Sequence, residues 1–364
     1  MVRESSRRRT FYSIGSAHRF GVSVRSITLR GMSEALPVAV IGCGRMGRLH
    51  TRVFSQMPRV KLIGVYDANA EAAEDAAEQY GTVSASMEQI IAEAKAVVIA
   101  VPTTYHLATA TPLLEKGIAC LIEKPLAGNS DEARQIAGVA ARHNAVVQVG
   151  HIERFNPAVR AMLELKIVPG FLEVTRISPL SFRSIDVGVV LDVMIHDIDI
   201  VLQLAGAPLK DVQAVGVSVI GDAEDICNAR LTFENGCVAN LTASRLSMKT
   251  ERRLRAFSSD TYVSLDYQKK YGLAIRKSGN LDTIRETVRQ IRAGEIEDLS
   301  QVNYTELVDV TELNIDDVEP LRAELEAFID SVTQGTPPVV SASDGLAAVE
   351  VAERVVKSMT KSTV

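Results

Sequence analysis

Residues 120–126 read CLIEKPL, an apolar run that ends on Glu123, Lys124 and Pro125. A lysine ammonium offers three hydrogen-bond donors, and burial can lower the pKa of a lysine from about 10.4. Such a group can hold a substrate hydroxyl and stabilise the negative charge that develops on its oxygen. Lys124 is therefore a candidate catalytic residue that Glu123 would orient or tune. A surface ion pair between the two side chains is the alternative.

A second candidate group lies in residues 188–201, GVVLDVMIHDIDIV. Asp192 and His196 are four residues apart, so they share one face if this apolar stretch forms a buried helix. Imidazole is the natural general base near neutral pH, and a carboxylate beside it orients the ring. With Asp199 the spacing would also permit a metal site, but no third strong ligand stands out, and we expect no metal. A core histidine without catalytic function remains an alternative.

The first apolar run, residues 38–42, leads directly into GCGRMGRLH. The glycines satisfy G-x-G-x-x-G, a spacing that gives a tight strand-to-helix turn and lets the backbone approach a pyrophosphate at a helix N-terminus. A plain turn without a ligand is the alternative. We expect this turn to contact a cofactor through Gly42, Gly44, Arg45, Met46 and Gly47.

Asp67 ends the next apolar run, twenty residues beyond Gly47. A carboxylate there can accept hydrogen bonds from the adenosine ribose hydroxyls, and it repels the 2′-phosphate of NADP. Neither Ala68 nor Asn69 supplies a cation that would offset this repulsion. The sequence therefore favours NAD as the cofactor, with a solvated aspartate at a strand end as the alternative.

The elements that must position these residues alternate along the first part of the chain. Short apolar runs predict strands at 38–42, 60–67, 96–101, 119–124 and 145–151. Amphipathic stretches between them predict helices at 46–57, 70–80, 87–94, 105–116 and 131–143. This alternation predicts an α/β, doubly wound parallel sheet over residues 37–152.

Ligands of such sheets bind at the carboxyl ends of the strands. Lys124 and Glu123 would lie at that edge, beside the nicotinamide end of the cofactor. Residues 101–106, VPTTYH, would reach the same edge and line the cofactor with Pro102, Thr103 and His106.

The pattern changes over residues 153–364, for which we expect an α+β domain that binds substrate and forms oligomers. Strands at 171–178, 211–220, 226–233, 237–244, 252–258 and 262–267 predict a large, mostly antiparallel open sheet. FENGC and SSDT signal hairpin turns in it. We expect helices from residue 157, over 191–206, and at 320–332 and 343–358, with an irregular segment at 281–317. The last helix could pack back on the first domain.

The junction between the two parts carries the polar stretch GHIERFNPAV at 150–159. Arg154 and Asn156 could contact an anionic substrate or the nicotinamide end of the cofactor. As an alternative, these side chains could cap the helix that begins at Pro157.

Composition limits the class of protein. The chain has 364 residues, 46% of them hydrophobic, and is long enough for two domains. Its formal net charge is -5, and it carries no basic stripe that would bind nucleic acid. No run is long and apolar enough for a membrane span, and the four scattered cysteines predict buried free thiols in a reducing, cytoplasmic setting.

The beginning of the chain differs from the rest. Its first thirty residues hold seven arginines and a single acid, Glu4, and residues 1–36 are expected to be a disordered or artefactual extension. RRRTF would suit a twin-arginine export signal, but His18, Arg19 and Arg25 interrupt the apolar segment that such a signal needs. Met32 looks like an ordinary start of translation.

Together, VIGCGRMGRLH, EKP and LDVMIHDID, in this order and at these separations, resemble the Gfo/Idh/MocA family of sugar and cyclitol oxidoreductases. The resemblance covers nearly the whole chain from Pro37 onward. It implies a Rossmann domain, a C-terminal domain with an open sheet, and dimers or tetramers formed through that sheet. It also implies that Lys124 holds the substrate oxygen, that His196 is the acid/base beside Asp192, and that NAD takes the hydride.

Within the family, GHIERFNPAV and DVGVVLDVMIHDIDIV look most like the branch that oxidises the 3-hydroxyl of UDP-N-acetylglucosamine. That branch implies a nucleotide-sugar substrate, a PLP aminotransferase as pathway partner, and a role in lipopolysaccharide biosynthesis. A diphosphate would need arginines, for which Arg154, Arg160, Arg176 and Arg183 are the candidates. One departure is Gly188-Val189-Val190, where the family often has two glycines.

Two other functions fit the same residues. A myo-inositol or free-sugar dehydrogenase of the same family would differ only in substrate. A non-catalytic NAD-binding sensor or scaffold belongs to a different class, and the presence of Lys124, Asp192 and His196 argues against it.

Overall fold

The computed structural model describes residues 35–180, 187–277, 281–295 and 308–361. The predicted extension up to residue 34 and Arg183 lie outside them. Within the described residues no helix is both long and apolar enough to cross a membrane. All four cysteines are buried free thiols, as expected.

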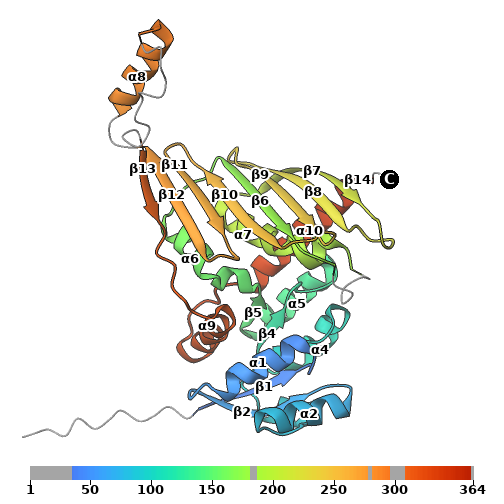
Figure 1. Ribbon diagram of the computed structural model, residues 1–364. Helices are drawn as coiled ribbons and strands as arrows, with labels where there is room; N and C mark the ends of the chain where they lie inside the picture. Colours follow the sequence, from blue (N-terminus) through green and yellow to red (C-terminus); the bar gives the residue numbers. More distant parts are fainter. Residues whose placement is uncertain (1–34, 181–186, 278–280, 296–307, 362–364) are drawn as a thin grey trace, which may run out of the picture. The chain divides into compact units, whose positions relative to one another are not determined.

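The first part of the chain forms a five-stranded parallel sheet with the strand order β2-β1-β3-β4-β5 (Figure 1). Its strands are β1 (Leu36–Ile41), β2 (Val60–Tyr66), β3 (Ala96–Ile99), β4 (Ala119–Glu123) and β5 (Val147–Gly150). The intervening helices are α1 (Arg45–Ser55), α2 (Ala70–Tyr80), α3 (Met87–Glu93), α4 (His106–Glu115) and α5 (Ser130–His143). The predicted doubly wound sheet is confirmed, and β1 begins one residue before the expected domain start.

This sheet has a defined ligand edge. The chain passes from β1 to β2 on one side and then returns to β3 on the other, so the direction of winding reverses between β1 and β3. A crevice forms at such a reversal, outside the carboxyl ends of the strands. The glycine turn after β1 and residues 100–106 after β3 flank this position, and Lys124 follows the next strand, β4.

The second part forms a nine-stranded sheet with the order β13-β12-β11-β10-β6-β9-β8-β7-β14. Its strands are β6 (Phe171–Ile177), β7 (Leu209–Val217), β8 (Ile226–Phe233), β9 (Val238–Ser244), β10 (Glu251–Phe257), β11 (Thr261–Asp266), β12 (Tyr271–Lys277), β13 (Val308–Glu312) and β14 (Met359–Lys361). Only the pairs β6–β9 and β7–β14 are parallel among these described strands, so the sheet is mostly antiparallel, as predicted.

Helices cover one face of this second sheet. The remaining helical elements are η2 (Ile152–Phe155), α6 (Pro157–Glu164), a π-helical turn (Val190–Met194), α7 (Ile195–Ala205), α8 (Leu281–Ala293), α9 (Pro320–Gln334) and α10 (Ala342–Ser358). Figure 1 shows α6, α7 and α10 against the same face. Strand side chains alternate between this buried face and the opposite one, as in a half-buried antiparallel sheet.

The last two long helices return to the first sheet. Leu325 and Phe328 of α9 are fully buried in the same hydrophobic cluster as Val40 of β1 and Phe54 of α1. In α10, a Cβ on Gly345 would lie 2.7 Å from Val149 of β5, so the helix packs closely on that strand. Segments at the end of the chain therefore complete the core of the cofactor domain.

Three elements of the second part were not predicted from the sequence. Residues 281–317 were expected to be irregular, but they include α8 and β13, and β12 was not predicted at all. The sequence of α8 is strongly amphipathic but polar on average, and VDVTE of β13 is an edge strand with few apolar residues, so the hydrophobic signal is weak. In FENGC the turn forms, but of its two central residues only Gly236 has a positive φ, 85°.

Candidate active site

At the glycine turn the backbone packs so closely that two of the glycines leave no room for a side chain. Gly42 has φ 97°, and a Cβ there would lie 2.5 Å from the carbonyl oxygen of Ala100. A Cβ on Gly47 would lie 1.7 Å from the carbonyl oxygen of Gly42, so α1 can approach β1 only with glycine at this position.

The same turn leaves room for an anionic group. Gly44 has nothing within 4 Å of the position of a Cβ, and no described side chain caps α1 at this residue. Arg45 is exposed and Met46 is partly buried at the start of the helix. Open space before free N–H groups at a helix N-terminus fits a pyrophosphate.

Asp67 lies beside this turn. Its Oδ2 accepts a hydrogen bond from the backbone N–H of Cys43 at 2.6 Å, and its Oδ1 accepts one from that of Asn69 at 2.9 Å. Each carboxylate oxygen retains a second acceptor site, as a contact to ribose hydroxyls requires. Burial and the charge of Asp67 raise the pKa of the Cys43 thiol to about 11, so the thiol stays protonated and adds no second negative charge.

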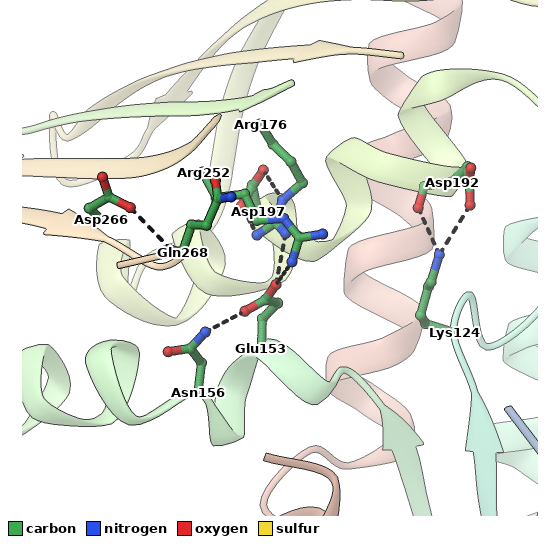
Figure 2. A network of polar contacts seen from close by, with 9 residues as sticks. All are labelled: Lys124, Glu153, Asn156, Arg176, Asp192, Asp197, Arg252, Asp266 and Gln268. Carbon is green, nitrogen blue, oxygen red and sulfur yellow. Dashed lines mark hydrogen bonds and ion pairs between the residues drawn. The ribbon is translucent and has the colours of Figure 1, made fainter. Parts of the chain in front are cut away.

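Lys124 meets the second domain at the end of β4. Its ammonium donates to the backbone carbonyl oxygen of Asp192 at 2.7 Å and to Oδ1 of the same residue at 3.3 Å (Figure 2). The two side chains are 19% and 30% exposed, so the pair is shielded but accessible from the site. The Lys124–Pro125 peptide bond is cis. The sequence candidates Lys124 and Asp192 are therefore brought together.

The segment that carries Asp192 is not the regular helix expected for residues 191–206. Residues Val190–Met194 form a π-helical turn, in which the N–H of Ile195 donates to the carbonyl of Val190, five residues back. Such turns widen a helix locally and occur frequently at functional sites. The wider turn coincides with the carbonyl group that Lys124 reaches.

Glu224, in the connection between β7 and β8, holds the start of this turn. Its carbonyl oxygen accepts from the N–H of Val189 at 2.8 Å, and its Oε1 accepts from that of Val190 at 3.0 Å. A Cβ on Gly188 would lie 2.0 Å from Oε1 of Glu224, so a side chain at this position would displace the carboxylate that holds the turn. Val189 and Val190, which stand where the family often has a second glycine, are fully buried, so the core accommodates this departure from the family pattern.

His196 lies at the start of α7, one turn beyond Asp192. Its Nδ1 is buried and has no hydrogen-bond partner among the described residues, while the side chain as a whole is partly exposed. Burial, followed by the cations of Lys124 and Arg176, lowers the pKa of His196 well below 6.5. The imidazole is therefore neutral at pH 7, which is the form that can accept a proton. No group of described histidine, cysteine and carboxylate side chains is placed to hold a metal ion.

The junction residues have internal partners. Arg154 is buried and binds Asp199 through two hydrogen bonds, at 2.6 and 2.9 Å. Asn156 caps α6, because its Oδ1 accepts from the N–H of Ala158 at 3.0 Å, and its Nδ2 donates to Glu153. Asn156 therefore has the predicted capping role, whereas Arg154 forms an ion pair instead of a cap, and direct contacts of both side chains with substrate stay a prediction.

Arg176 is also unavailable for an anionic ligand. Its guanidinium binds Asp197 through two hydrogen bonds and Glu153 through a third, at 2.7 to 2.8 Å (Figure 2). Arg252 of β10 approaches Glu153 only at 3.6 Å, and its side chain is 47% exposed. Of the arginines drawn in this network, Arg252 is therefore the one with spare donors.

The residues predicted to line the cofactor after β3 differ in their exposure. Pro102 is exposed and Thr103 partly exposed at the end of the strand. His106 is buried, with Nδ1 3.0 Å from the carbonyl oxygen of Pro125 and Nε2 3.0 Å from that of Val101. Its ring therefore ties the loop after Lys124 to the end of β3, and a contact between His106 and the cofactor stays a prediction.

Sequence reasoning missed several polar residues around Lys124. His50 of α1 binds Glu123 at 2.7 Å, and Glu324 of α9 lies fully buried nearby. The signal for His50 was available, because it follows the glycine motif on the inward face of a predicted helix. Glu324 gave no signal, since its helix is nearly two hundred residues away along the chain.

The position of Asp67 predicts the cofactor preference. In Asp67→Ala the repulsion of a 2′-phosphate and the ribose contacts are both removed, so the ratio of NAD to NADP affinity should fall about tenfold. Fluorescence titration with NADH and NADPH measures both affinities. Glu78→Ala, on the exposed side of α2, is the control, and an unaltered ratio in Asp67→Ala would refute the ribose contact.

Comparisons with known proteins agree with this architecture. The family model for the NAD-binding Rossmann fold of the Gfo/Idh/MocA oxidoreductases matches residues 36–151, and the model for their C-terminal alpha/beta domain matches residues 181–364. UDP-N-acetylglucosamine 3-dehydrogenase of Acidithiobacillus ferrooxidans is 41% identical over 230 residues, which cover 63% of this chain and 73% of that relative. Inositol 2-dehydrogenase of Rhizobium meliloti is 26% identical over 339 residues, covering 88% and 96%.

Solved structures show the same fold over most of the chain. UDP-N-acetylglucosamine 3-dehydrogenase GnnA from Acidithiobacillus ferrooxidans superimposes with a TM-score of 0.79 at 31% identity, covering 89% of this chain and 97% of that one. Levoglucosan dehydrogenase in complex with NADH and L-sorbose shares the fold, with a TM-score of 0.74 at 20% identity. With both of its parts matched and the NAD-binding turn in place, the chain belongs to the Gfo/Idh/MocA family of NAD-binding oxidoreductases.

Proposed function

We propose that this protein oxidises a secondary hydroxyl of a sugar to a ketone, with Lys124, Asp192 and His196 as its catalytic residues. The observation that carries the proposal is the contact between Lys124 and Asp192, which joins the cofactor edge of the first sheet to the turn before His196. NAD, when bound, supplies the nicotinamide C4 that accepts the hydride.

The chemistry of the three residues supports distinct roles. An ammonium has three N–H donors, and Asp192 engages two of those of Lys124, so the third can be given to the substrate oxygen. His196 is neutral at pH 7 and can take the hydroxyl proton. Oxidation removes that proton and the hydride from one carbon–oxygen unit and leaves a ketone, whose oxygen Lys124 continues to hold.

We infer that the substrate is UDP-N-acetylglucosamine and that its 3-hydroxyl is oxidised. The 41% identity to an enzyme of that name supports this substrate. Inositol 2-dehydrogenase is a more distant relative at 26% identity, so a cyclitol or free sugar is the second candidate. The ketone would be a substrate for a PLP aminotransferase, on a route to amino sugars of lipopolysaccharide.

Arg252 is our candidate for the diphosphate of such a substrate. Arg154 and Arg176 are buried in ion pairs, and Arg160 lies exposed on α6. Arg252 shares its side of β10 with the buried Leu254, on the face covered by helices, and it lies close enough to affect His196. An arginine with spare donors at this place suits a phosphate oxygen.

We also infer that the uncovered face of the second sheet binds another copy of the chain. Phe171, Phe257 and Tyr262 gather there, with ring centroids 5.7 and 4.8 Å apart between successive rings. Partly buried aromatic residues on a sheet face suit a homodimer or homotetramer interface. Sedimentation equilibrium measures the assembly, and a monomer at micromolar concentration would contradict it.

A substrate panel tests the proposed reaction. The protein with NAD is offered UDP-N-acetylglucosamine, N-acetylglucosamine and myo-inositol separately, and NADH fluorescence is followed. A parallel series contains 2-oxoglutarate, so that an enzyme that retains its reduced cofactor is also detected. We expect turnover with the UDP-sugar alone. Turnover with myo-inositol alone would move the substrate to the second candidate, and silence with all three would reject the proposal.

The role of Lys124 predicts a selective loss of turnover. Lys124→Ala removes the donor to the substrate oxygen, so kcat should fall roughly a thousandfold or more while the affinity for NAD changes little. Steady-state kinetics and NADH titration separate the two effects. Lys116→Ala, at an exposed position beyond α4, is the control, and unchanged kcat in Lys124→Ala would exclude Lys124 from catalysis.

The role of Arg252 predicts a change in KM. Arg252→Ala should raise the KM for the UDP-sugar about tenfold or more, because a charged hydrogen bond to the diphosphate is lost. Arg253→Ala is a matched control, since the neighbouring side chain points to the opposite face of the same strand. If both variants have the KM of the natural protein, the diphosphate lies elsewhere.

A further inference from the structure

A cluster of buried polar side chains lies behind Lys124 and is not used in the proposed reaction. It consists of His50 of α1, Glu123 of β4, Gln148 of β5 and Glu324 of α9. His50 binds Glu123, and Gln148 binds the backbone of Glu324. Gln148 and Glu123 lie on the same face of the paired strands β4 and β5. His50, Gln148 and Glu324 are fully buried. Four separate elements of the cofactor domain therefore each place one polar side chain in the same dry region.

Glu123 is well provided with partners. Its Oε1 is 2.7 Å from Nε2 of His50, and its Oε2 accepts from the backbone N–H of Lys124 at 3.3 Å. A Cβ on Gly150 would lie 3.1 Å from Oε2, so the glycine that ends β5 leaves the space that this carboxylate fills. Burial alone would raise the pKa of Glu123, but His50 and Lys124 outweigh burial and hold the pKa below its usual value. Glu123 is thus ionised.

Glu324 is in the opposite situation. Neither oxygen of its carboxyl group has a hydrogen-bond partner among the described residues, although its backbone carbonyl accepts from Nε2 of Gln148 at 3.0 Å. An ionised carboxylate without a partner in a dry interior is very costly, so such a group takes up a proton instead. Burial, followed by the charge of Glu123, raises the pKa of Glu324 well above 4.5.

We propose that Glu123 and Glu324 form a carboxyl pair that holds one proton, and that Glu324 is a positioning residue which limits the charge behind Lys124 to a single negative unit. Two carboxyl groups in one buried site cannot both ionise easily. His50 and Lys124 face the ionised member, and Gln148 contacts the backbone of the other. On α9 itself, Arg322 pairs with Glu326 on the partly exposed side of the helix, and just before the helix Glu319 pairs with Arg52 of α1. The fully buried His151 is a further titratable group on which the charge of Glu123 acts. The role of Lys124 rests on the proposed function, whereas the shared proton does not.

The shared proton has a defined effect on stability. In the unfolded chain Glu324 ionises near its usual pKa of about 4.3, whereas in the folded protein it keeps its proton to a higher pH. As pH rises above the unfolded pKa, the unfolded state loses the proton first, so the free energy of unfolding falls until the folded pKa is reached. Below pH 4 Glu324 is protonated in both the folded and the unfolded state, so it no longer lowers the free energy of unfolding.

Glu324→Gln removes the titrating group and keeps its size. The apparent Tm of this variant relative to the natural protein should therefore rise with pH from about pH 5 and level off once the folded pKa of Glu324 is passed. Glu326→Gln is the matched control, because Glu326 lies on the same helix, is 46% exposed and pairs only with Arg322 among the described residues. A Tm difference for Glu324→Gln that is as flat with pH as that of the control would overturn the proposal.

The pair itself is tested in a Glu123→Gln background and by infrared spectroscopy. Without the charge of Glu123, the pH-dependent gain from Glu324→Gln should level off at a lower pH, and an unchanged gain would show that Glu324 titrates alone. In the natural protein at pH 7, the infrared spectrum should contain the carbonyl band of a protonated carboxyl group that Glu324→Gln lacks. Absence of this band rejects the shared proton even if the double variant fails to fold.

The positioning role is read from the pH profile of kcat/KM. In the natural protein a second negative charge develops behind Lys124 when Glu324 ionises at high pH. Glu324→Gln cannot develop this charge, so the alkaline limb of its kcat/KM profile should lie about one pH unit lower than that of the natural protein. A profile scaled by the same factor at every pH would indicate packing alone and reject the role. The thermal and infrared measurements use no substrate, so they stand even if the proposed sugar is wrong.

Discussion

The contact between Lys124 and Asp192 is the constraint that the rest of the structure serves. An ammonium that is mostly shielded from water requires oxygen acceptors, and here both come from one residue of the second domain. The contact exists only if β4 ends where it does, if the segment before α7 opens into a π-helical turn, and if Glu224 holds the start of that turn. Three separate parts of the chain therefore determine one hydrogen-bonded pair.

Other buried charges of the site are also paired with groups of opposite charge. Two buried arginines near His196 have defined anions: Arg154 binds Asp199, and Arg176 binds Asp197 and Glu153. Breaking such a buried pair typically costs about 3–5 kcal/mol, because an unpaired charge remains in a dry place. The imidazole of His196 is kept neutral by burial and by the cations of Lys124 and Arg176, which lower its pKa. Behind Lys124 the same need is met by a proton on Glu324.

The sequence predicted the cofactor domain closely and the second domain less well. Strands of the first sheet are buried on both faces and read as continuous apolar runs, and the helices between them match the predicted ranges to within two residues at each end. The second domain is different, because α8 is polar on average and β13 has few apolar residues, so both leave a weak pattern. Arg154 and Asn156 were proposed for substrate from their place at the junction, but pattern alone could not reveal that Asp199 and the N-terminus of α6 engage them.

By itself the sequence determined the chemistry-bearing groups whose signal is local. Gly42, Gly44 and Gly47 follow a strand, Asp67 ends the next one, and Lys124 is delivered to the carboxyl edge because parallel strands all end there. Only the tertiary structure decided which groups meet across long separations. Lys124 and Asp192 are 68 residues apart, and α9 brings Glu324 beside Glu123. The physical reason is that local patterns record burial and turn geometry, whereas the partner of a buried charge is chosen by packing, which no local pattern encodes.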